Sequence, residues 1–135
     1  MSKQIRVLEP ASVWNHFADL NAVPRPSKKE ERVIQFMVDF GNSLGLPTEV
    51  DHIGNVFIRK EATAGMGERT PIVLQAHLDM VHQKNNDTDF NFDTQGIDMY
   101  VDGDWVKARG TTLGADNGMG VAYIMALLSS KDIPH

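Results

Sequence analysis

The feature that most constrains the fold is Pro71-Ile-Val-Leu-Gln-Ala-His77, an almost continuous apolar run of strand length. Runs of this kind are typical of a central strand that is buried on both faces, as in the parallel sheets of α/β proteins. Segments with helical spacing lie before this run and after it. The sequence therefore predicts an α/β fold, with a mixed β-sheet flanked by helices.

Three segments are predicted to be helical. Leu8–Asn21 carries apolar side chains on one face. Ser27-Lys-Lys-Glu30 has the pattern of a capping box, which predicts a second helix of about sixteen residues that stops at Gly45. An apolar helix is expected over Met119–Leu128, directly after a glycine-rich turn at Gly110–Gly118.

Two hairpins are predicted where the apolar spacing changes to a period of two. Thr48–His52 and Asn55–Lys60 are expected to pair as the first. Met99–Val106 is expected to form the second, because its central Asp-Gly pair suits a tight turn.

Length and composition exclude several classes of protein. A chain of 135 residues has room for one domain, and its net charge of −5 disfavours a nucleic-acid partner. The absence of cysteine excludes disulfides and thiolate ligands, so any metal must be held by histidine and carboxylate. No apolar run approaches the ~18 residues of a membrane span, and the first residues lack the apolar stretch of a secretory signal. A cytoplasmic chain without a membrane partner is expected.

The first candidate site is His77-Leu-Asp79. In an extended strand, residues two positions apart point to the same side, and open α/β sheets bind ligands at the carboxyl ends of their strands. A neutral imidazole can bind zinc while a nearby carboxylate orients it. On its own, the same pattern also fits a chance pairing or a capped turn.

The second candidate site is the glycine-rich segment that contains Asp116. One interpretation is a helix N-cap made by Asp116 or Asn117. A phosphate loop is poorly supported, because the glycines fit neither common nucleotide-binding pattern and no lysine follows. A short carboxylate on such a backbone could instead bridge two cations ~3.5–4 Å apart.

The acidic loop Asn85–Gly96 offers a third possibility, calcium binding. Its acidic residues alternate as in an EF-hand, but Phe92 occupies the position that requires glycine, and Asp98 stands where glutamate is expected. A solvated surface loop is the favoured interpretation. Of the remaining histidines, His82 follows the apolar run closely enough to line the same cleft.

Taken together, the two motifs around His77 and Asp116 resemble the di-zinc aminopeptidase/carboxypeptidase superfamily, and within it the aminoacyl-histidine (Xaa-His) dipeptidases. The resemblance includes Val23-Pro-Arg-Pro-Ser27 and the Tyr100–Trp105 hairpin. It implies that residues 1–135 are the N-terminal portion of a peptidase catalytic domain. The parent would be a cytoplasmic metallo-dipeptidase, a hydrolase of Xaa-His and related dipeptides that uses a metal-activated water.

The resemblance also implies a role for each matched residue. His77 would bind one zinc ion, and Asp116 would bridge two. Asp79 would be the catalytic aspartate, which tunes the zinc on His77 and helps to position the general base. A cis peptide bond is expected at Asp116–Asn117. Two Zn²⁺ ions per site are implied, with Mn²⁺ or Co²⁺ as possible substitutes.

The other family elements have no matching motif in this sequence. The general-base glutamate, the remaining ligands, the lid domain and a possible homodimer interface are expected beyond His135. The isolated chain is therefore expected to bind zinc weakly, to be inactive, and to associate through an unpaired sheet edge. Two alternatives stay open: a non-catalytic binding module that keeps the fold, and a metal-binding protein that uses the acidic loop.

Overall fold

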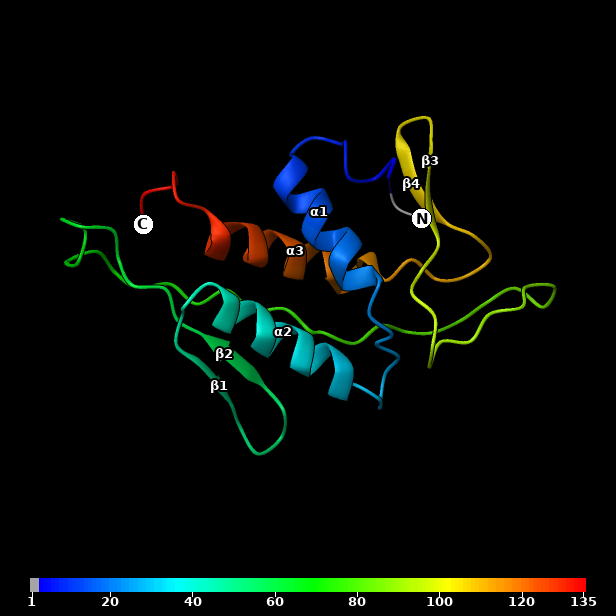
Figure 1. The fold of residues 1–135 in the computed structure, drawn as a ribbon, viewed down its shortest axis with the longest axis horizontal. Coiled ribbons are helices and arrows are strands. Elements are labelled where there is room, and N and C mark those ends of the chain that lie inside the picture. The colour runs from blue at the N-terminus through cyan, green and yellow to red at the C-terminus, as the bar shows by residue number, and fades with distance from the viewer. Residues whose placement is uncertain (1–2) are drawn as a thin grey trace.

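The computed structural model describes residues 3–135. Figure 1 shows the arrangement of its helices and strands. In chain order they are α1 (Ala11–Asn21), α2 (Glu31–Ser43), β1 (Thr48–Val50), β2 (Val56–Ile58), β3 (Met99–Asp102), β4 (Trp105–Ala108) and α3 (Ala115–Ser129).

The first part of the core lies where α1 crosses α3 (Figure 1). Phe17 of α1 is fully buried there, and Trp14 meets its ring edge-on at a centroid distance of 6.1 Å. The buried members of this cluster are Ile5, Val13, Phe17, Ala18, Met99 and Ala122. Because Met99 begins β3, the same cluster also anchors the second hairpin.

The second part of the core joins α2 to α3. Its buried members are Leu20, Val33, Met37, Val121 and Met125. Ala76 and Leu78 pack against this cluster from the extended segment that runs between α2 and α3, seen as the green trace in Figure 1. The segment that carries His77 is thus fixed by alternate side chains, while His77 itself points away from the cluster.

Both predicted hairpins are confirmed. β1 pairs with β2 in antiparallel register, with Thr48 opposite Ile58. β3 pairs with β4 in the same sense, and Asp102 opposite Trp105 closes the turn. Gly103 has a φ of 58°, a left-handed conformation that favours glycine. The Asp-Gly pair therefore marks the turn correctly.

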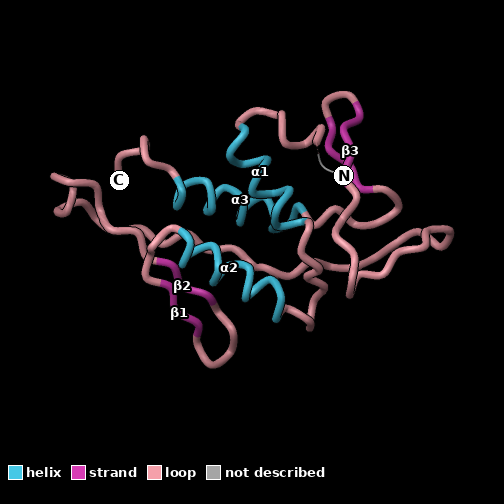
Figure 2. Tube along the Cα trace, viewed as in Figure 1, coloured by secondary structure: helices cyan, strands magenta, loops and turns pink. Residues whose placement is uncertain are grey.

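The predicted central strand at Pro71–His77 is wrong for the described residues. This segment is extended but belongs to no ladder (Figure 2), and Val73 is 92% exposed. A strand forms only beside neighbours that satisfy its backbone groups. Outside the hairpins, the described residues provide only two isolated bridges, Pro26 to Met80 and Lys84 to Thr111.

The α/β class is nevertheless confirmed, because the chain combines helices and strands: α1 and α2 come first, the four strands follow, and α3 comes last. In place of the expected mixed sheet, the described residues form two separate antiparallel pairs of strands. The apolar side chains of Pro71–His77 are typical of a buried strand, but most of them are exposed among residues 3–135.

The predicted capping box at the start of α2 is also wrong. The helix begins at Glu31 with Glu30 as its N-cap residue, and no side chain caps it. Glu30 Oε1 instead accepts a hydrogen bond from the backbone N–H of Lys28 at 2.7 Å. The Ser27 hydroxyl points to a different part of the chain, as described below. At α1, the helix begins at Ala11 and not at Leu8, because the preceding Pro10 is extended.

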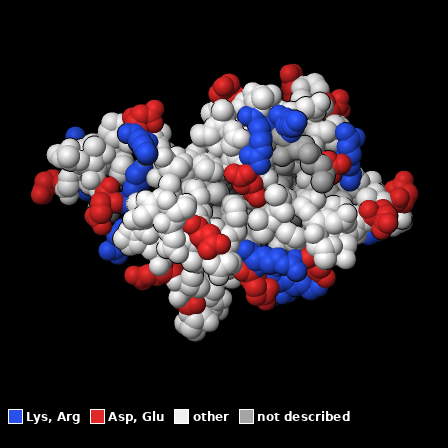
Figure 3. Space-filling view, in the orientation of Figure 1, with Lys and Arg blue, Asp and Glu red and all other residues white. Residues whose placement is uncertain are grey.

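Charged side chains are mixed over the face shown in Figure 3, where lysines and arginines alternate with acidic groups. In the part of the chain that is described, none of the helices combines the length and apolar character that crossing a bilayer requires.

Candidate metal centre

The structure brings His77 and Asp116 together. His77 Nε2 lies 3.2 Å from Asp116 Oδ1, although the two residues are 39 positions apart in the sequence. On the other side of the ring, Nδ1 lies 3.0 Å from Asp79 Oδ1. The imidazole is therefore held between two carboxylates, in an arrangement whose outer side faces solvent.

The two carboxylates also determine how readily His77 takes up a proton. Partial burial alone would lower the pKa of the imidazole, but hydrogen bonds with Asp116 and Asp79 outweigh it and raise the pKa. Both ring nitrogens thus face negative charge. A cation at Nε2 would meet the same electrostatic environment as the proton it replaces.

Asp79 is fixed by a second partner. The Ser27 hydroxyl donates to Asp79 Oδ2 at 2.5 Å, so each carboxylate oxygen has its own hydrogen bond. The hydrogen bond from Ser27 is the main reason that the pKa of Asp79 is lowered; partial burial opposes it, and His77 adds to it. The carboxylate is therefore ionised near neutral pH and oriented toward the imidazole.

Asp116 owes its exposure to the irregular start of α3. Gly114 precedes it with a φ of 74°, and Asp116 itself is non-helical at φ −97° and ψ 104°. Its side chain is 98% exposed, with His77 Nε2 as its contact. The Asp116–Asn117 peptide bond is cis, as expected.

Asn117 supplies the helix cap. Its Oδ1 accepts a hydrogen bond from the backbone N–H of Gly120 at 3.2 Å. The alternative in which Asp116 caps the helix is therefore wrong, and the Asp116 carboxylate is left for a partner outside the helix.

The donor set suits a divalent metal ion. A histidine at zinc usually gives Nδ1–H to a carboxylate and binds the metal ion through Nε2, and a nearby carboxylate can add an oxygen ligand. Within residues 3–135, however, no group of three or more histidine, aspartate or glutamate side chains could hold a metal ion. His77 and Asp116 are therefore two candidate donors that lie together, fewer than a zinc site requires.

The acidic loop gives no support to calcium binding. Asp93 is occupied by an ion pair with Lys29 at 2.7 Å, and Asp98 lies 3.3 Å from Arg109. Asn91 Oδ1 accepts a hydrogen bond from the backbone N–H of Asp93. These side chains hold the loop in place and do not converge on one point.

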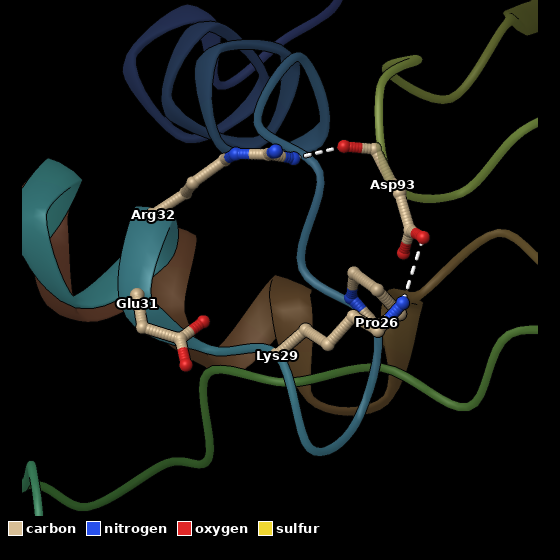
Figure 4. A pocket seen from close by; sticks show the side chains of 5 residues that line it. All are labelled: Pro26, Lys29, Glu31, Arg32 and Asp93. Carbon is tan, nitrogen blue, oxygen red and sulfur yellow. Dashed lines mark hydrogen bonds and ion pairs between the residues drawn. The ribbon is translucent and has the colours of Figure 1, made fainter.

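A pocket opens between this loop and the start of α2 (Figure 4). It is lined by Pro26, Lys29, Glu31, Arg32 and Asp93. Lys29 binds the Asp93 carboxylate, and Arg32 donates to the backbone oxygen of the same residue. The pocket thus contains neither donor of the candidate metal centre, and its two cations are already paired with Asp93.

His82 lies apart from the donor pair. Its ring packs edge-on against Phe92 at a centroid distance of 5.6 Å, and Phe92 in turn meets Phe90. The contacts of His82 are therefore with the acidic loop.

Sequence reasoning missed two residues beside the centre, Arg25 and Ser27. Both belong to the Val-Pro-Arg-Pro-Ser segment that carries part of the family resemblance. An arginine between two prolines is an unusual sequence feature and was the available signal. For Ser27, the apparent capping box offered a local explanation that concealed its contact with Asp79.

Comparison with known proteins concerns the fold first. The chain superposes on a tripeptidase from Staphylococcus aureus with a TM-score of 0.67 at 20% identity, over 92% of this chain and 33% of that one. At this identity the likeness shows the fold alone. No family model matches the chain.

Two dipeptidases are much more similar. An aminoacylhistidine dipeptidase from Vibrio alginolyticus superposes with a TM-score of 0.95 at 48% identity, over all of this chain and 28% of that one. The cytosol non-specific dipeptidase of Escherichia coli K12 is 49% identical over 132 residues, which are 98% of this chain and 27% of that protein. The resemblance to aminoacyl-histidine dipeptidases is thus confirmed. The chain spans about a quarter of the length of these relatives.

Proposed function

We propose that this chain is the part of a metal-dependent dipeptidase that supplies one imidazole and one bridging carboxylate to a two-metal site. The observation that carries the proposal is the 3.2 Å approach of His77 Nε2 to Asp116 Oδ1. The 49% identity to a dipeptidase supports the reaction class, hydrolysis of a peptide bond, and dipeptides as substrates.

In this proposal the His77 imidazole would hold one ion, and the Asp116 carboxylate would be shared by two ions. When bound, such ions lower the pKa of a water molecule and polarise the carbonyl of the scissile bond. His77 and Asp116 contribute placement: both project into solvent, where a dipeptide can approach.

Asp79 acts through His77. It would accept a hydrogen bond from Nδ1–H and so leave the lone pair of Nε2 for the metal ion that His77 and Asp116 would share. Ser27, which donates to the other oxygen of Asp79, prevents the carboxylate from turning away. We propose that Asp79 is the catalytic aspartate beside the metals and that its role is to orient the His77 imidazole. The general base is proposed to belong to residues outside this chain.

We further propose zinc as the resident ion, with Mn²⁺ or Co²⁺ as substitutes, because one imidazole nitrogen with carboxylate oxygens suits all three. The cytosol dipeptidase of E. coli supports a cytoplasmic location. The Vibrio aminoacylhistidine dipeptidase supports substrates with a C-terminal histidine. Residues 1–135 would then be the N-terminal portion of the catalytic domain, and a homodimer would form through other parts of the protein.

The test uses the protein made from the complete reading frame, with its zinc content measured by mass spectrometry and hydrolysis measured on alanyl-histidine. We expect two zinc ions per subunit, and we expect His77→Ala and Asp116→Ala each to lose at least one. Hydrolysis should fall by more than about a hundredfold, since even outer partners of a metal site contribute 10–100-fold.

His52→Ala is the matched control, because His52 is exposed in the turn of the first hairpin. It should keep both the metal and the activity. If His77→Ala also kept both, the proposed ligand would be wrong. A wild-type protein that neither binds zinc nor cleaves dipeptides would instead support the non-catalytic binding module.

A further inference from the structure

Arg25 is a buried cation without an ionic partner among the described residues. It is 1% exposed, and every hydrogen bond of its guanidinium goes to a neutral oxygen. Burial lowers the pKa of Arg25 to about 10, and Asp79 opposes this effect. Burying an arginine away from a carboxylate is costly, so its contacts need a compensating structural reason.

The contacts of Arg25 join the two halves of the candidate metal centre. Nη1 donates to the backbone oxygens of Leu78 at 3.0 Å and Asp79 at 3.3 Å, directly after His77. Nη2 donates to the backbone oxygen of Gly114 at 2.8 Å, two residues before Asp116. One planar group therefore holds both donor-bearing segments at a fixed separation.

The glycine-rich turn is shaped to accommodate this guanidinium. A Cβ on Gly114 would lie 2.6 Å from Arg25 Nη2, and a Cβ on Gly118 would lie 2.7 Å from the same atom. Side chains essentially never approach so closely. The absence of side chains at these two positions thus provides the space that Arg25 occupies.

Two neighbours fix the guanidinium and the backbone of Arg25. Asn21 of α1 accepts from Nη2 at 2.7 Å and donates to the backbone oxygen of Leu113 at 2.9 Å, which orients Arg25 from the side of the helix. The backbone oxygen of Arg25 accepts from the N–H of Met80 at 3.0 Å. Arg25 is therefore attached to the segment around His77-Leu-Asp79 through both its backbone and its side chain.

We propose that Arg25 is a positioning residue for the metal centre: its guanidinium sets the distance between His77 and Asp116, and thereby the affinity for the metal. This inference rests on the proposed function. It differs from a purely structural role, because it requires metal affinity and ligand geometry to change when the guanidinium is replaced in a protein that still folds.

The first test is Arg25→Lys in the protein made from the complete reading frame. Lysine keeps the charge but lacks the planar fork that reaches Leu78, Asp79 and Gly114 together. We expect the affinity for Zn²⁺, measured by calorimetry, to fall at least tenfold. In the Co²⁺-loaded protein we expect the visible absorption bands to shift, because they report ligand geometry.

Arg6→Lys is the matched control. Arg6 is also hydrogen bonded to side chains, Asn15 and Asp19 of α1, but it has no contact with either donor-bearing segment. The same chemical change there should leave Zn²⁺ affinity and the Co²⁺ spectrum unaltered. If Arg25→Lys folds and also leaves both unaltered, the positioning role is overturned.

Gly118→Ala provides a second route if Arg25→Lys does not fold. It keeps the arginine but places a methyl group against Nη2, so it should weaken Zn²⁺ binding in the same direction. A folded Gly118→Ala protein with wild-type affinity would also contradict the inference. Failure of the proposed function is recognised separately, because His77→Ala would then leave Zn²⁺ binding intact.

Discussion

Replacing Ser27 distinguishes two uses of one hydroxyl group. The sequence pattern assigns it to the N-terminus of α2, paired with Glu30. In the structure it donates to Asp79 Oδ2 at 2.5 Å, with the backbone oxygen of Met80 at 3.1 Å as an alternative acceptor. The first assignment couples Ser27 energetically to Glu30, and the second couples it to Asp79.

The expected coupling follows from the geometry. A hydrogen bond to a charged group contributes about 1.5–3 kcal/mol to stability, and the Asp79 side chain is 31% exposed, which favours the lower end. When Asp79 is absent, the hydroxyl can turn to Met80 and recover part of that energy. We therefore expect a coupling free energy of about 1–1.5 kcal/mol between Ser27 and Asp79.

Two double-mutant cycles measure this coupling by urea unfolding of the chain at pH 7, followed by circular dichroism. One combines Ser27→Ala with Asp79→Ala, and the other combines Ser27→Ala with Glu30→Ala. The Glu30 cycle should give less than about 0.3 kcal/mol, within the error of additivity. A larger coupling to Glu30 than to Asp79 would refute the reasoning and restore the capping box.

Two further predictions concern pH and association. Burial lowers the pKa of His16 despite the opposing charge of Asp19, so the unfolded state binds the proton more readily. The contribution of His16 to the free energy of unfolding should therefore be fully present above the ordinary value of 6.5 and be lost as the pH drops below it, whereas the raised pKa of His77 acts in the opposite direction. His16→Gln, measured beside the wild type by urea unfolding at several pH values, should show a smaller fall; an identical fall would exclude His16 as the cause. The exposed segment around Val73 should promote association of the chain. Val73→Lys should shift sedimentation velocity profiles toward the monomer, whereas a wild-type chain that is monomeric at all concentrations would contradict this expectation.

The elements that the sequence predicts correctly are those defined by local contacts. The second hairpin follows from its Asp-Gly turn, in which Gly103 adopts the required positive φ. The helices follow from apolar spacing, because α1 and α2 each bury one face. Their first residues do not follow from the sequence: α1 begins only after the extended Pro10, and α2 lacks the capping box predicted for Ser27 and Glu30.

The features that the sequence does not reveal depend on distant partners. Strand formation at Pro71–His77 requires neighbouring strands, and an apolar pattern alone cannot say whether they are present. The contact of Ser27 with Asp79 spans 52 positions, and that of Arg25 with Gly114 spans 89. For the site itself, spacing placed His77 and Asp79 on one side, while the approach of Asp116 followed from the family resemblance.

The reach of the Arg25 contacts also bears on the order of events during folding. Its guanidinium binds groups 53, 54 and 89 positions away, and closing such loops is entropically costly before the helices have docked. No local segment can bring His77 and Asp116 together by itself. We therefore expect the donor pair to assemble late, after α1 has packed on α3, so that a metal ion would be captured by an already formed framework and would not serve as its nucleus.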